Sequence, residues 1–98
     1  MAVSKKWVDA ARELSALIDP IAKQIMKEWE HEFIEIQLLG IEPRFDREII
    51  KRIKAEPEIH AKFIQFMVLV VDNYGKIWYE FSEEQKEIIT LKESKIFW

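Results

Sequence analysis

The chain has 98 residues, of which 49% are hydrophobic and 34% charged, and its formal net charge is −3. This length and balance predict one small globular domain spanning residues 1–98, and they exclude a disordered chain. The mildly acidic charge argues against a protein that binds polyanions over its whole surface. The absence of cysteine excludes disulfides, thiolate metal ligands and a thiol nucleophile, and it is consistent with a reducing compartment.

Neither a secretory leader nor a membrane span is predicted. Charged residues begin at Lys5 and Lys6, where a leader would be apolar, and the most apolar run, residues 63–71, is far shorter than the ~20 residues that cross a bilayer. We therefore expect a soluble, cytoplasmic protein. Its fifteen isoleucines, eleven lysines and fourteen glutamates are typical of a thermophilic protein, although an A/T-rich coding sequence would enrich Ile and Lys as well.

Two helices are predicted within the first forty residues. Ser4 is placed to cap a helix that runs to about Ile18. Asp19-Pro20 has the pattern of an N-cap followed by proline at the first helical position, so a second helix is expected from there to residue 39, ending at Gly40. Apolar residues at helical spacing are expected to face inward, among them Trp7, Leu14, Ile18, Ile25, Met26 and Trp29.

The second half of the chain predicts three more helices. The first covers about residues 44–55, with Phe45 and three isoleucines facing inward, and Glu56-Pro57 ends it. The second, over 57–81, has apolar residues at spacings of 4, 3, 4, 4, 3 and 4, close to a heptad pattern. Ser82 and Gln85 form a capping box that opens a last helix, beyond which residues 92–98 are helical or extended. The residues of the apolar pattern are Ile59, Phe63, Phe66, Val70, Tyr74, Ile77 and Phe81.

These elements predict an all-α fold, a compact bundle of four to five helices with a long central helix near residues 57–81. One alternative stays open. The β-branched residues of 66–71, the Asn73 and Gly75 turn residues and the segment 76–81 would also fit an α+β fold with a 66–81 β-hairpin. The seven-position helical pattern favours the helix.

The two histidines do not predict a metal or catalytic site. Glu28 and His31 have the Glu-x-x-His spacing of di-iron bundles, but such a site needs a second pair, and Pro57 stands three residues before the other histidine, His60. Neither histidine has an identifiable nucleophile or orienting carboxylate beside it. We therefore expect no enzyme, no catalytic residue, no metal, no cofactor and no small-molecule substrate.

The helix over residues 44–54 has a basic face. Arg44, Arg47, Lys51 and Lys54 fall within about 80° of arc, and Arg52 lies on the other flank. Such a face can lie along the phosphates of a nucleic acid. The alternative is a solvated face whose cations pair with the acidic segments 28–35 or 80–87.

The helix over residues 57–81 also has more apolar surface than its own bundle needs. Ile64, Val68 and Val71 lie beside the main apolar face, which widens it to about 200°. Four tryptophans, and two large aromatics at the end of the chain, add to this excess. The predicted interface residues are Ile64, Met67, Val68, Val71, Trp78, Phe97 and Trp98.

The sequence thus predicts a non-catalytic, homo-oligomeric interaction or adaptor protein, with a dimer favoured. The alternative is a small nucleic-acid-associated protein or regulator that docks residues 44–54 on phosphates through Arg44, Arg47, Lys51, Arg52 and Lys54.

Overall fold

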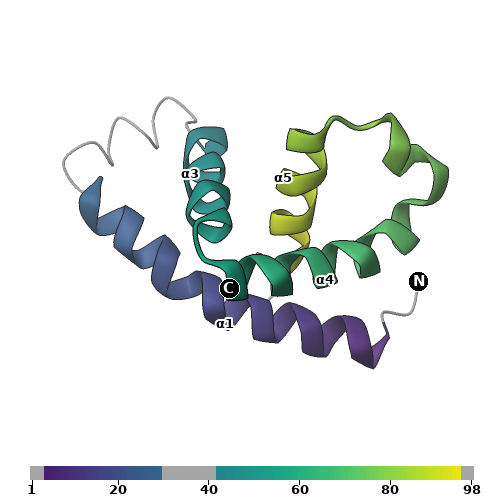
Figure 1. Cartoon of the computed structure of the whole chain (residues 1–98), viewed down its shortest axis with the longest axis horizontal. Coiled ribbons are helices and arrows are strands. Elements are labelled where there is room, and N and C mark those ends of the chain that lie inside the picture. The colour runs from purple at the N-terminus through teal and green to yellow at the C-terminus, as the bar shows by residue number, and fades with distance from the viewer. Residues whose placement is uncertain (1–3, 30–41, 96–98) are drawn as a thin grey trace.

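The described part of the protein is a bundle of helices. The computed structural model describes residues 4–29 and 42–95, and within these ranges it contains no strand (Figure 1). The elements are α1 (Lys5–Glu28), α3 (Glu42–Lys54), α4 (Pro57–Tyr74), the 3₁₀ helix η2 (Gly75–Glu80) and α5 (Glu83–Ser94). Each α-helix contacts the other three. The predicted all-α bundle is confirmed, and the alternative of a 66–81 hairpin is wrong, because helices span that segment.

The first helix, α1, continues through Pro20, so the predicted break at Asp19-Pro20 is wrong. It begins as expected, with the Trp7 backbone N–H donating to Ser4 Oγ at 3.1 Å. Its buried apolar residues then continue past the proline without a change of face. Burying each large apolar side chain contributes about 1.5–3 kcal/mol, which together outweighs the ~3 kcal/mol cost of an internal proline. The expected helix end at Gly40 lies outside the described residues. The buried apolar residues of α1 are Trp7, Ala11, Leu14, Ile18, Ala22 and Ile25.

The core lies where α4 meets the other helices. Phe63, Phe66 and Val70 are fully buried, and the Trp7 and Phe66 rings pack at 5.3 Å between centroids. From α3, Ile49, Ile50 and Ile53 face the core as predicted. The apolar residues of all four described α-helices therefore form one cluster.

The predicted helix over 57–81 is shorter than expected, because α4 ends at Tyr74. Gly75 has φ +60° and ψ −138°, a conformation that residues with a Cβ rarely adopt. The chain continues as η2, whose three residues per turn shift the side chains out of the α-helical pattern. Ile77, predicted to face inward, is therefore 51% exposed, whereas Trp78 is 3% exposed.

Polar contacts fix α5 against its neighbours. The capping box is confirmed, with Ser82 and Gln85 exchanging hydrogen bonds of 2.9 and 3.2 Å. At the other end, Lys95 Nζ donates to Asp46 Oδ1 at 2.6 Å, and this aspartate is only 1% exposed. The contact between Lys95 and Asp46 places the end of α5 on the first turns of α3. Residues 92–94 complete α5, and 96–98 lie outside the described residues.

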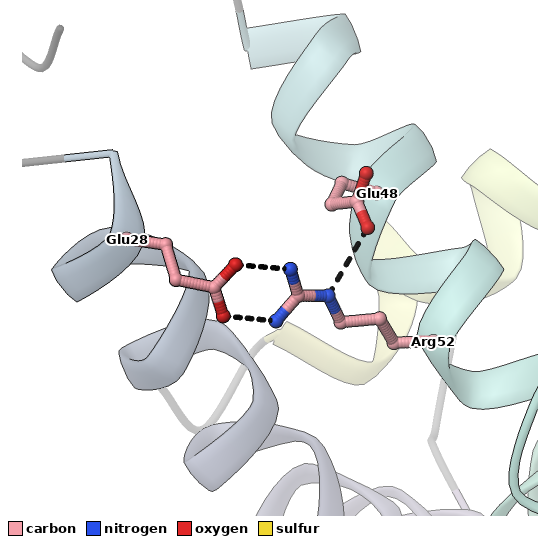
Figure 2. Close-up of polar contacts among 3 residues, drawn as sticks. All are labelled: Glu28, Glu48 and Arg52. Carbon is pink, nitrogen blue, oxygen red and sulfur yellow. Dashed lines mark hydrogen bonds and ion pairs between the residues drawn. The ribbon is translucent and has the colours of Figure 1, made fainter.

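Arg52 joins α1 to α3 (Figure 2). Its guanidinium donates to both carboxylate oxygens of Glu28, at 2.7 and 2.6 Å, while its Nε donates to Glu48 at 3.1 Å. The hydrogen bonds to Arg52 lower the pKa of Glu28 below its ordinary value. Those to Glu28 and Glu48 raise the pKa of Arg52, so the guanidinium stays charged. A planar guanidinium facing a carboxylate also fixes orientation, which a lysine would not do.

Replacing Pro20 should test the continuous helix. We expect Pro20→Ala to stabilise the protein by about 1–3 kcal/mol, because it restores a backbone donor in the helix interior and removes the ring clash. A change of 1 kcal/mol shifts the melting temperature of a domain of this size by roughly 4–8 °C, which calorimetry resolves. An unchanged or lower melting temperature would support a helix start at Pro20 instead.

The Arg52–Glu28 pair should make stability depend on acid. Because the pKa of Glu28 is depressed in the folded state, the pair stabilises the protein above the ordinary carboxyl pKa of 4.5, and this stabilisation is lost as the pH falls through the lower folded pKa. Denaturant unfolding across this range should show a shallower acid dependence for Glu28→Gln than for wild type. Glu80→Gln, at an exposed carboxyl on η2, is the control and should leave the dependence unchanged.

Candidate interaction surface

The helix α4 has apolar residues on two opposite sides. Its inner side, formed by Phe63, Phe66 and Val70, is fully buried. Ile64 and Val68 are 43% and 62% exposed. At 100° per residue these two lie about 130° and 170° from the centre of the inner side. The neighbouring helices therefore cover one side of α4 and leave the other in solvent.

We call this exposed side the outer face of α4; its residues are Ile64 and Val68, with Met67 and Val71 at its edge. Met67 and Val71 are half-buried, where the outer face meets the core. Four of the seven predicted interface residues therefore lie together on one surface. Phe97 and Trp98 lie outside the described residues.

The remaining predicted interface residue, Trp78, belongs to the core and not to this surface. Its ring packs 5.7 Å from that of Tyr74 and 6.2 Å from that of Phe81. The prediction assumed that α4 continued to residue 81, and the turn at Gly75 removes that assumption. The Tyr74 hydroxyl donates to Glu93 Oε1 at 3.0 Å, so this aromatic cluster also ties the end of α4 to α5.

A shallow groove of about 380 Å³ lies beside the outer face, between α1 and α4. The two helices run antiparallel, because Trp7 packs on Phe66 while Glu13 pairs with Lys62 at 2.7 Å. The sequence analysis missed the α1 side of this groove, which exists only once the two helices are packed. The lining residues are Lys6, Ala10, Gln65, Val68 and Leu69.

Other exposed apolar residues lie on other elements. Met26 on α1 is 43% exposed, and Ile77 and Tyr79 on η2 are 51% and 74% exposed. Single exposed apolar side chains are common on folded proteins and need no partner to explain them. Met26 is therefore a useful reference for the outer face, because its exposure equals that of Ile64.

The basic face of α3 is largely paired within the chain. Arg47 bonds to Glu84 and Lys54 to Glu87, both at 2.6 Å, so two of the predicted phosphate contacts bind α5. Arg52 binds α1 through Glu28, as shown in Figure 2. The Arg44 guanidinium stacks over the Trp29 ring, 4.5 Å from its centroid. Lys51 is exposed to solvent.

Of the three residues considered as metal ligands in the sequence, the structure describes two, Glu28 and His60. Glu28 is a partner of Arg52, and His31 lies outside the described residues. His60 is half-buried on α4. Among residues 4–29 and 42–95, no three histidine or acidic side chains form a group that could hold a metal ion.

Of the helices described, none combines the length and the apolar character needed to cross a membrane. The chain matches no family model, no curated protein and no solved structure.

Proposed function

We propose that the protein is a non-catalytic interaction or adaptor protein that self-associates through the outer face of α4. The observation that carries this proposal is the exposure of Ile64 and Val68 on a helix whose opposite side already fills the core. A helix at the surface of a monomer needs only one apolar side. The outer face of α4 lowers solubility and does not stabilise the fold of a single chain.

The chemistry of the outer face supports association and not catalysis. Its polar neighbours in the groove are Lys6 and Gln65, which lack a paired acid or base. An apolar centre with a polar border is the usual composition of a protein–protein contact. Each 100 Å² of apolar surface removed from water contributes about 2.5 kcal/mol before the costs of association.

The proposal predicts that Ile64→Asp strongly weakens self-association. A carboxylate buried without a partner in an apolar contact should cost at least about 3 kcal/mol, or roughly a 100-fold weaker dimer. Sedimentation velocity over a range of concentrations measures this directly. The matched control is Met26→Asp, which places the same charge on an equally exposed apolar site on another helix.

We expect Met26→Asp to remain dimeric, and circular dichroism to show that both variants stay folded. A wild-type chain that remains monomeric far above micromolar concentration would overturn the proposal. So would equal weakening by the two substitutions.

The alternative, a nucleic-acid-binding protein that docks α3 on phosphates, stays a prediction. Three of its five cations are paired with carboxylates of α1 and α5, which would have to be displaced or shared. We therefore expect only weak binding. Fluorescence anisotropy with labelled duplex and single strands at two salt concentrations tests it. Tight binding that falls steeply with salt, and is lost in an Arg44/Arg47/Lys51 triple alanine variant, would favour the alternative.

A further inference from the structure

A single residue separates α4 from η2, two segments that the apolar spacing of the sequence predicts to be one helix. The helix α4 ends at Tyr74 and η2 begins at Gly75, so no loop lies between them. Gly75 has φ +60° and ψ −138°, whereas a glycine that caps a helix usually has a ψ of about +50°. A Cβ atom at this position would meet nothing within 4 Å. The glycine is therefore required by the direction of the backbone and not by a neighbouring side chain.

The sequence of η2 also fits an extension of α4. Runs of 3₁₀ helix longer than about three or four residues are uncommon, and η2 has six. Tyr74, Ile77 and Phe81 continue the apolar spacing of α4, yet Ile77 is 51% exposed in the turn. A 3₁₀ stretch within a helical segment often marks a hinge. Residues 75–81 therefore have two competing conformations, the observed turn and about two further turns of α4.

The helix α5, which follows the turn, contributes little to the core but makes several polar contacts with α3. Within α5, all of which the structure describes, Leu91 is the one buried apolar side chain. The polar contacts join Glu84 to Arg47 and Glu87 to Lys54, each at 2.6 Å. The surface that receives α5 therefore matches the apolar and charged side chains of this particular helix. A second copy of the chain carries the same helix.

Extending α4 through Phe81 would move α5 away from this surface. Seven added residues lengthen the helix by about 10 Å. The place that α5 leaves on α3 is then filled, with every original contact, by α5 of another copy. One interaction opposes the extension, because Trp78 contacts the rings of Tyr74 and Phe81 in the turn. The chain with the turn therefore remains the main form of the wild type.

We propose that residues 75–81 are the hinge of a domain exchange, in which two copies extend α4 and each places α5 on α3 of the other. The contacts of α5 with the core are remade between the copies, so the net cost is confined to the hinge and to the entropy of association. Short hinge segments with a demanding backbone conformation favour such an exchange. The outer face of α4 takes no part in it, and the inference therefore stands apart from the proposed function.

Replacing the glycine tests the hinge. An alanine adopts the backbone angles of Gly75 only with strain, but it favours an extended α-helix. We expect Gly75→Ala to favour the open hinge at least about tenfold, and the dimer roughly 100-fold because it contains two hinges. Sedimentation velocity after refolding at high protein concentration measures this. Lys76→Ala is the control and should behave as wild type, because Lys76 is exposed and its φ is not positive.

Charge reversal between α3 and α5 tests the exchange itself, in chains that keep Gly75. One variant carries Arg47→Glu and Lys54→Glu on α3. The other carries Glu84→Lys and Glu87→Lys on α5. Each variant alone places like charges between the two helices, whereas a mixed, exchanged dimer joins opposite charges at both contacts.

The two charge variants are refolded together and weighed by native mass spectrometry. The ratio of the squared heterodimer concentration to the product of the homodimer concentrations cancels the effects of the substitutions on each chain alone. We expect this ratio to exceed its statistical value at least about tenfold. A dimer formed through the outer face would give the statistical value, because each α5 would stay on its own α3.

The outcomes separate the exchange from association through the outer face. A Gly75→Ala dimer that persists when Ile64→Asp is added supports the exchange, and one that is lost would overturn it in favour of the outer face. A folded Gly75→Ala monomer would also overturn the exchange. If this variant does not fold, a statistical mixture of the charge variants, or the absence of dimers, would overturn it instead. A wild-type monomer in sedimentation overturns the proposed function alone.

Discussion

The burial of the inner side of α4 is the interaction on which the other features of the structure depend. Phe63, Phe66 and Val70 are fully buried on α4, and α1, α3 and α5 all contact this helix. Three neighbouring helices can surround one side of a fourth, but they leave the opposite side open. The outer face of α4 and the groove beside α1 therefore follow from the packing that forms the core. The surface that we propose for association is the reverse of the surface that holds the fold together.

Electrostatics connect the helices around this core. The cations of α3 extend in two directions, with Arg52 reaching α1 and Arg47 and Lys54 reaching α5. Exposed pairs of this kind contribute little each, typically below 1 kcal/mol, but they bias the orientation of helices that apolar contacts alone would let slide. The pair of Lys95 with Asp46 differs because it is more deeply buried. Asp46 is 1% exposed, and a buried carboxylate without a cation beside it would destabilise the fold. In a slightly acidic chain, pairing with carboxylates of α1 and α5 is enough to explain the basic face of α3.

The sequence predicted the helices and most of their inner sides, because periodic burial is a local signal. It failed where two local signals competed with packing. Asp19-Pro20 resembles a helix start, but the buried stripe from Ile18 to Ala22 keeps the helix intact. The pattern over 57–81 resembles one rod, but a single glycine turns the chain, exposing Ile77 and burying Trp78. The exposed side of α4 was predictable from its second apolar line, whereas the groove was not, since it depends on which helix packs alongside.

Leu91, near the end of α5, is fully buried in the same cluster as Trp7, near the start of α1. The helices α1 and α5 are in contact although they are far apart in the sequence, and closing so long a loop slows folding. During synthesis α1 is made before α3, α4 and α5, so its apolar stripe stays uncovered until they follow. Until then the nascent chain exposes the apolar side of a long amphipathic helix, and such exposed apolar surface favours chaperone binding and aggregation.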